Sequence, residues 1–170
     1  HGEPPPDVTG RHVIITDFSY KQPVILEMAA QCKSLAIIDH HETAQEDLAG
    51  LPALKMNWFE HTASAEAVED GHPLNRVGAW FDMDSSGCAL AWRYFFAGRR
   101  MPNFLQIVQD RDLWRFALPG TREITAVTFS HPYSFDIWDE LVEACDNGLM
   151  KKRLVKEGQA LLRKHDKDIA

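Results

Sequence analysis

The chain has 170 residues, of which 45% are hydrophobic and 25% are charged, a composition typical of a globular domain with one sizeable core. No apolar stretch approaches the roughly 20 residues that a membrane helix needs, so we expect no membrane partner. The net charge of −7 argues against a broad nucleic-acid-binding surface. Three widely spaced cysteines form neither a disulfide framework nor a paired zinc motif, which favours a cytoplasmic location.

The charge is distributed unevenly along the chain. Residues 151–170 contain seven Lys or Arg and three Asp or Glu, a local charge of +4, which leaves −11 for residues 1–150. We interpret the basic end as the solvated face of a helix. The acidic remainder suits a cation better than a phosphate.

The first predicted elements form a βαβ unit over residues 12–40. An apolar run ends in Asp17-Phe18, a helical spacing extends from Pro23 to Cys32, and a second apolar run ends at Asp39. The right-handed crossover of such units places Asp17 and His40 at the same edge of the sheet. The predicted fold class is α/β, a three-layer α/β/α arrangement with a mainly parallel sheet, followed by a helical C-terminal segment.

The rest of the chain predicts short elements and then helices. A loop with a short helical turn is expected at 42–54, a weaker strand at 55–59, a surface excursion at 61–77 and a short extended piece at 79–81. Helices are expected at 88–96, from 102 into 114, at 121–129, at 134–145 and at 149–165. We expect the tryptophans and phenylalanines in the core and assign none of them a binding role.

The segment Asp39-His40-His41 is the strongest indication of chemistry. It closes a buried strand, and in open α/β sheets the ligand site lies just beyond the carboxyl ends of the strands. Adjacent ionisable groups at such a place are costly to bury without a partner, and a divalent metal is a suitable one. Asp17 on its own favours a turn or cap aspartate. Paired with the Asp-His-His segment one strand later, it favours a functional site.

A second group of candidates lies further along the chain. Ser86-Gly87 precedes a helix, where a serine is a typical N-cap and the free N–H groups also suit an anion. Asp110 follows the apolar face of a helix and is a candidate oxygen ligand. Arg111 suits a bidentate phosphate contact, although an ion pair with a nearby acid such as Asp112 is nearly as plausible an interpretation.

Four segments together resemble the DHH phosphoesterase superfamily, which includes exonucleases, small-nucleotide phosphatases and pyrophosphatases. They are Val13–Tyr20, Ile37–Thr43, Ser86–Trp92 and Gln109–Trp114. The resemblance implies that Asp17, His40 and Asp110 bind metal and that His41 faces the scissile phosphate. It further implies that Asp39 orients its neighbours. The implied cofactor is Mn²⁺ or Mg²⁺, with two ions in the complete enzyme, and the implied substrate-binding residues are Ser86, Gly87 and Arg111.

The chain departs from the family pattern at both ends. The family's first motif, an acidic cluster that ends an earlier strand, and its smaller C-terminal domain have no counterpart in this sequence. We therefore expect residues 1–148 to be a phosphoesterase domain without its first strand, and 149–170 to begin a linker helix. An open sheet edge would favour a homodimer, and clean monomeric elution over a wide concentration range would count against it.

The expected function is hydrolysis of a phosphodiester or phosphomonoester of a small nucleotide or short oligonucleotide, with little activity in this fragment. The alternative is a catalytically degenerate module of the same fold that binds a protein partner.

Overall fold

The chain divides between Tyr94 and Phe95 into two compact units. The computed structural model describes residues 3–55 and 73–169. We call residues 1–94 the first unit and residues 95–170 the second unit. This division differs from the predicted boundary after residue 148, because the helix that begins there is packed against the other helices of the second unit.

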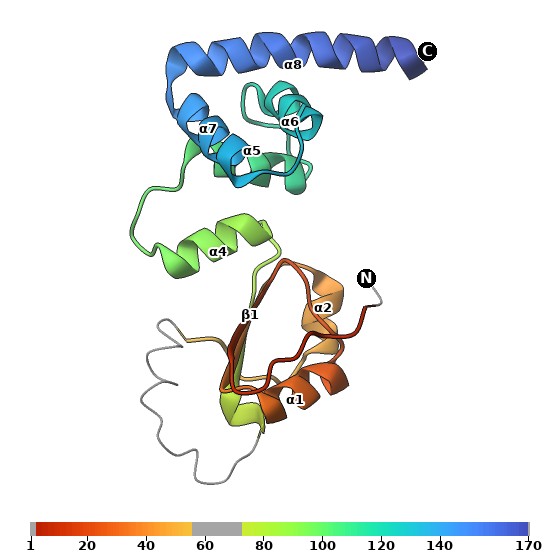
Figure 1. Cartoon of the computed structure of the whole chain (residues 1–170), viewed down its shortest axis with the longest axis vertical. Helices are drawn as coiled ribbons and strands as arrows, with labels where there is room; N and C mark the ends of the chain where they lie inside the picture. Colours follow the sequence, from red (N-terminus) through yellow and green to blue (C-terminus); the bar gives the residue numbers. More distant parts are fainter. Residues whose placement is uncertain (1–2, 56–72, 170) are drawn as a thin grey trace. The chain divides into compact units, whose positions relative to one another are not determined.

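The first unit contains a three-stranded parallel sheet in the order β1-β2-β3. Figure 1 labels β1 and the helices of this unit. Strand β1 (His12–Thr16) pairs with β2 (Ser34–Asp39), which pairs with β3 (Val77–Phe81). All six residues of β2 are buried, as expected for a central parallel strand covered on both faces. The predicted α/β fold class is confirmed, and β3 starts two residues before the predicted extended piece.

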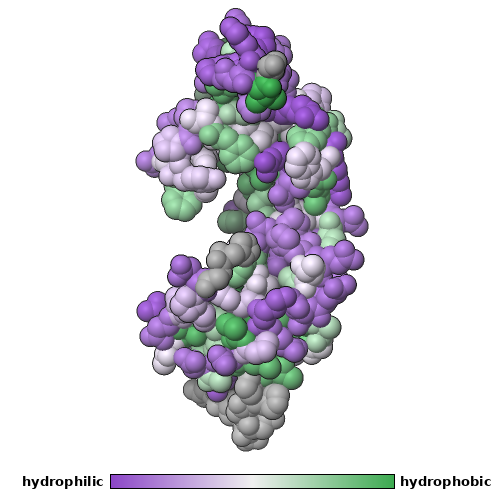
Figure 2. Space-filling model, turned by 90° about the vertical axis from the view of Figure 1, so that its right-hand side faces the viewer, coloured by the Kyte–Doolittle hydropathy of each residue, from purple (hydrophilic) through white to green (hydrophobic). Residues whose placement is uncertain are grey.

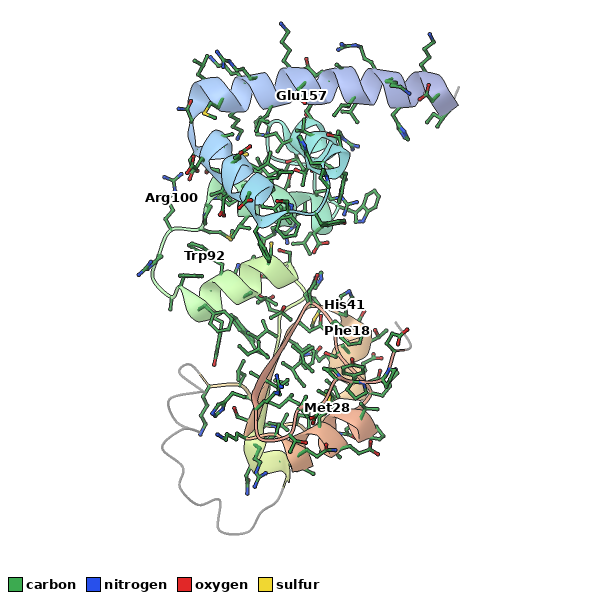
Figure 3. The ribbon with its side chains drawn as sticks, viewed as in Figure 1. Phe18, Met28, His41, Trp92, Arg100 and Glu157 are labelled. Atoms are coloured by element: carbon green, nitrogen blue, oxygen red, sulfur yellow. The ribbon has the colours of Figure 1, made fainter. Side chains whose placement is uncertain are left out.

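Helices cover both faces of this sheet. On one face, α1 (Gln22–Gln31) packs Ile25, Met28 and Ala29 against odd-numbered residues of β2. Figure 3 shows Met28 on the side of α1 that faces the strands. On the other face, α4 (Gly87–Phe95) packs Leu90 and Tyr94 against Ala36 and Ile38 of β2. The alternation of side chains along β2 thus supplies both cores, and the three-layer arrangement is confirmed.

Strand β1 forms one edge of the sheet. Its residues alternate between exposed and half-buried, and Ile14 is 44% exposed. Within the described residues, β2 is its one strand neighbour. An apolar parallel strand with an open edge is unusual, because parallel sheets are normally covered.

The second unit consists of four helices around one apolar core. They are α5 (Asn103–Asp112), α6 (Thr121–Ser130), α7 (Phe135–Asp146) and α8 (Gly148–Ile169). The buried core residues are Phe104, Ile107, Ile124, Val127, Leu141 and Cys145. Helix α8 adds Leu154, Val155 and Leu161 to this core, while its other face is largely hydrophilic at the top of Figure 2. The basic residues of α8 therefore lie on a solvated face.

Most predicted elements are confirmed, with boundaries shifted by one to four residues. The predicted helical turn after residue 41 is helix α2 (Glu42–Asp47), and a short 3₁₀ helix, η1 (Pro73–Arg76), precedes β3. The weaker strand at 55–59 and most of the excursion at 61–77 lie outside the described residues. No helix in the described part of the chain has the length and apolar character needed to cross a bilayer.

The prediction that the tryptophans and phenylalanines belong to the core is wrong for several side chains of the second unit. Trp114 is 77% exposed and Phe129 is 57% exposed. Phe135, the first residue of α7, is 82% exposed, and so is most of nearby Tyr133, for which no core position was predicted. The prediction rested on the usual burial of large aromatic side chains, which these residues do not follow.

Candidate metal centre

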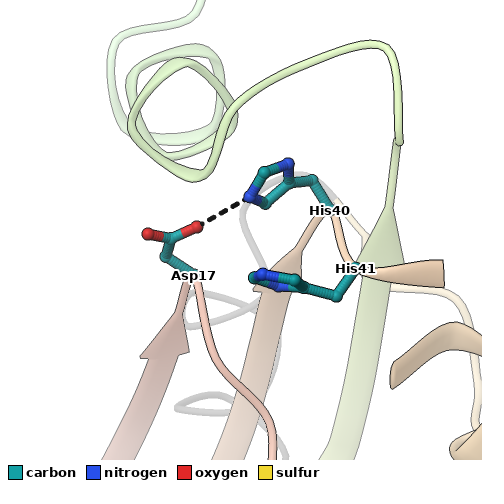
Figure 4. A group of neighbouring side chains, drawn as sticks. All are labelled: Asp17, His40 and His41. Atoms are coloured by element: carbon teal, nitrogen blue, oxygen red, sulfur yellow. Dashed lines mark ion pairs between the residues drawn. The ribbon is translucent and has the colours of Figure 1, made fainter. Parts of the chain in front are cut away.

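Three potential metal ligands meet at the carboxyl-terminal edge of the sheet. Asp17 directly follows β1, and His40 and His41 directly follow β2. One ligand atom from each residue lies within 4.8 Å of the other two. Figure 4 shows Asp17 and His40 turned toward each other across the ends of the two strands, with His41 beside them. The expected position of Asp17 and His40 at one edge is confirmed.

Asp17 is held in a strained backbone conformation. Its φ angle is +60°, in the left-handed region that non-glycine residues rarely adopt, although aspartate tolerates it better than most. Its N–H donates to the Ile38 carbonyl at 3.0 Å, which ties the turn to β2. Such strain costs on the order of 1–3 kcal/mol and is concentrated at functional sites. The turn directs the Asp17 carboxylate to a point where its Oδ1 lies 3.0 Å from His40 Nε2.

Gly87, the first residue of α4, makes room for the Asp17 side chain. A Cβ atom at position 87 would lie 2.5 Å from the Asp17 Cβ and Cγ atoms, closer than real contacts permit. The carboxylate thus occupies the space directly beside the N-terminal turn of α4. This contact gives Gly87 a role in shaping the centre that its sequence position alone does not reveal.

Asp39 is completely buried and orients the residues around it. Its Oδ1 accepts hydrogen bonds from the His40 N–H at 2.8 Å and from His41 Nδ1 at 2.7 Å, and its Oδ2 accepts one from the Ser19 hydroxyl at 3.0 Å. A buried carboxylate is tolerated because these donors replace water. The bond to Nδ1 fixes the tautomer and the ring plane of His41, which is the arrangement found around metal-bound imidazoles.

The donor set fits a divalent cation. One carboxylate oxygen and two imidazole nitrogens suit Mn²⁺ better than they suit Mg²⁺, which prefers oxygen ligands alone. The side chains of Asp17 and His41 are more than half exposed, whereas that of His40 is 12% exposed. The centre is therefore accessible from solvent on one side and supported by packed residues on the other.

The start of α4 is built from buried polar groups. The Ser86 hydroxyl accepts a hydrogen bond from the Ala89 N–H at 3.3 Å, so Ser86 caps the helix as predicted. Arg93 donates to both Asp82 and the Ser85 hydroxyl, which itself donates to Asp82 at 2.7 Å. The Ser85 hydrogen bond lowers the pKa of Asp82; burial opposes this, while the Asp84 N–H and Arg93 lower it further. This network lies directly before and along the first turns of α4, the helix that begins at Gly87. The proposed substrate contacts of Ser86 and Gly87 stay predictions.

Asp110 lies in the second unit and is 4% exposed. Its Oδ1 accepts a hydrogen bond from the Ala117 N–H, and its Oδ2 accepts from the Leu118 N–H and from the Thr121 hydroxyl at 2.6 Å. Burial raises the pKa of Asp110, but these hydrogen bonds and nearby Arg115 together lower it below 3.8. The carboxylate therefore organises its own loop. Its predicted role as a metal ligand stays a prediction.

Arg111 does not pair with Asp112, which was the alternative to its predicted phosphate contact. Within residues 3–55 and 73–169, no carboxylate pairs with it, and its guanidinium lies over the Phe129 ring at 4.9 Å from the ring centre. The interpretation of Arg111 as an internal partner of Asp112 is therefore wrong. Arg111 therefore contacts an aromatic ring and no carboxylate of the described residues.

The sequence analysis missed the role of Ser19 and the contact of Gly87 with Asp17, although it named Gly87 as a candidate substrate-binding residue. Ser19 follows Asp17 by two positions, and its contact with Asp39 depends on how the turn after β1 crosses the end of β2. Gly87 is prominent in the sequence only as part of a helix start. In both cases the signal is tertiary, because the contacting partner is 20 or more residues away.

The chain is similar to part of a viral protein. Over 137 residues the chain is 28% identical to the uncharacterized protein R106 of Acanthamoeba polyphaga mimivirus. The match covers 80% of this chain but only 27% of the viral protein, so the chain spans about a quarter of that relative's length. No protein-family model matches the chain, and no solved structure matches it. Because the viral protein is itself uncharacterized, this similarity does not indicate an activity for the chain.

Proposed function

We propose that the chain belongs to a DHH-type phosphoesterase that requires Mn²⁺ or Mg²⁺ and hydrolyses a phosphate ester of a small nucleotide or short oligonucleotide. The observation that carries this proposal is the meeting of Asp17, His40 and His41 at the ends of adjacent parallel strands, with ligand atoms within 4.8 Å of one another. Ligand sites of open α/β sheets lie at this edge. The DHH-like order of the sequence segments is consistent with it.

Each residue has a distinct task in this proposal. Asp17 and His40 hold the cation, and Asp39 keeps His41 oriented so that its Nε2 faces the phosphate. A divalent cation at such a centre polarises phosphoryl oxygens and makes bound water more acidic. Asp110 would supply a further ligand in the complete enzyme. The exposure of Asp17 and His41 leaves room for a substrate beside the centre.

Titration calorimetry with Mn²⁺ tests the proposal on this chain. We expect saturable binding that weakens at least tenfold in Asp17→Asn and in His40→Gln, since each change removes one charged or basic ligand. His131→Ala is the matched control, because this exposed histidine belongs to the second unit. Binding that is absent, or equal in all four proteins, would contradict the proposal and favour the partner-binding module instead.

Two further expectations belong to the same proposal. A cytoplasmic location is supported by the three cysteines, which are all free thiols. Self-association through β1 is supported by the open edge of this strand and the exposed side chain of Ile14. Light scattering over a broad concentration range should show a rising mean mass, and a constant monomer mass would contradict the dimer.

A further inference from the structure

The loop between α5 and α6 is organised largely by hydrogen bonds to Asp110. Besides the three hydrogen bonds to its carboxylate, the Asp110 carbonyl accepts from the Arg115 N–H at 2.9 Å and from the Phe116 N–H at 3.2 Å. One buried residue therefore receives donors from nearly every position between 115 and 121. The loop is ordered and has a defined shape.

This loop presents an aromatic side chain to solvent at an energetic cost. Trp114 has a φ of 53° and Phe116 a φ of 47°, and the left-handed region is a genuine outlier for bulky residues. Trp114 is nonetheless 77% exposed, with its ring 5.6 Å from the Phe116 ring in an edge-to-face arrangement. The strained backbone at Trp114 places its ring in solvent and not in the core. A strained conformation that does not improve packing indicates a ligand-binding role.

Two arginines flank the exposed rings. Arg122 lies over the Phe116 ring at 4.0 Å from its centre, and Arg111 lies over the Phe129 ring at 4.9 Å. Arg122 and Phe129 are seven residues apart on α6, so they lie on the same face about two turns apart. Among the residues that the structure describes, no carboxylate forms an ion pair with either guanidinium.

The net charge differs between the two units. Residues 95–170 contain twelve Lys or Arg and eleven Asp or Glu, a net charge of +1, whereas residues 1–94 carry −8. Within the second unit the basic excess lies on α8, because residues 151–170 carry +4 and residues 95–150 carry −3. The positive charge offered to an anionic ligand beside the exposed rings is therefore the local charge of Arg111 and Arg122.

We propose that these five residues form a binding surface for single-stranded oligonucleotides, which we call the aromatic–arginine surface: Arg111, Trp114, Phe116, Arg122 and Phe129. A base stacks on Trp114, and the two guanidiniums contact backbone phosphates through their N–H groups. Exposed aromatic rings interleaved with arginines are the combination that single strands require, because every base has a π face and every linkage a charge. The inference deepens the proposed function by naming an oligonucleotide as its substrate class.

Fluorescence anisotropy with fluorescein-labelled hexadeoxyadenylate and hexadeoxythymidylate, in EDTA, tests this surface on the whole chain. We expect saturable binding of both probes that weakens about tenfold in Trp114→Ala and is largely restored in Trp114→Phe. Arg122→Gln should lower the slope of log Kd against log salt by roughly 0.7, the contribution of one phosphate contact to a single strand. Tyr133→Ala is the matched control, since this equally exposed aromatic lies outside the surface and should bind normally.

The outcomes separate this inference from the proposed function. Asp17→Asn and His40→Gln should keep full affinity for the probes in EDTA, because the metal centre is not required for stacking. Oligonucleotide binding without any Mn²⁺ binding would leave the surface standing and remove the phosphoesterase. An anisotropy that does not change up to about 100 μM protein, the weak end of non-specific binding, would contradict oligonucleotide binding by this surface. A protein partner would then be the favoured ligand. Equal affinities of Trp114→Ala and Tyr133→Ala would contradict oligonucleotide binding by this surface too.

Discussion

Replacing Gly87 by alanine should weaken Mn²⁺ binding by roughly 10–100-fold without removing any ligand. The added Cβ would lie 2.5 Å from the Asp17 Cβ and Cγ atoms, so the carboxylate must leave the position where it faces His40. Calorimetry measures the affinity, and circular dichroism shows whether the fold is retained. Gly148→Ala is the matched control, because nothing lies within 4 Å of a Cβ there.

A second variant separates a displaced ligand from a damaged fold. Asp17→Gly removes the side chain that the new Cβ meets, and glycine adopts a φ of +60° without strain. We therefore expect Asp17→Gly alone to raise the free energy of unfolding by about 0.5–1 kcal/mol while abolishing the site. In that background, Gly87→Ala should cost little stability. Native Mn²⁺ affinity in Gly87→Ala would show that Asp17 does not act from the position seen here.

Replacing Gly158 by alanine should lower the free energy of unfolding of the second unit by about 1–3 kcal/mol. Gly158 is buried where α8 crosses α6, and a Cβ there would lie 2.6 Å from the Glu123 Cα atom and clash with the Glu123 carbonyl. Backbone atoms within a packed helix cannot yield as a side chain does. Urea unfolding followed by circular dichroism at 222 nm measures the change.

Replacing Gly148 by alanine should instead raise the free energy of unfolding. Gly148 begins the same helix with open space around it, so alanine there adds helix propensity worth up to about 1 kcal/mol. If Gly158→Ala lowers the free energy of unfolding and Gly148→Ala raises it, the loss at Gly158 arises from its contact with α6. Equal shifts would contradict the close approach of the two helices.

The sheet and its edge were predictable because their signals are local. Apolar runs bounded by a helical spacing predict parallel strands, and the handedness of the crossover then places Asp17 beside His40. Asp39 was assigned an orienting role by the family resemblance, and its hydrogen bonds to both following residues agree with that role. The seven described α-helices were each anticipated at least in part for the same reason.

The remaining features depend on contacts that no local pattern encodes. The contact of Gly87 with Asp17 arises only when α4 covers the sheet, and the left-handed conformations of Trp114 and Phe116 depend on hydrogen bonds to Asp110. Aromatic residues are usually buried, so the exposure of Trp114 contradicts the statistical expectation. The division after Tyr94 falls within α4, where the helical pattern is continuous.

Pulsed electron paramagnetic resonance of the Mn²⁺-loaded chain tests the central claim most directly, since nitrogen ligands couple to the bound ion. We expect ¹⁴N coupling typical of imidazole ligation in the unaltered chain, reduced in His40→Gln and unchanged in His131→Ala. A spectrum without nitrogen coupling, or one that His40→Gln leaves unchanged, would contradict a metal centre at the ends of β1 and β2.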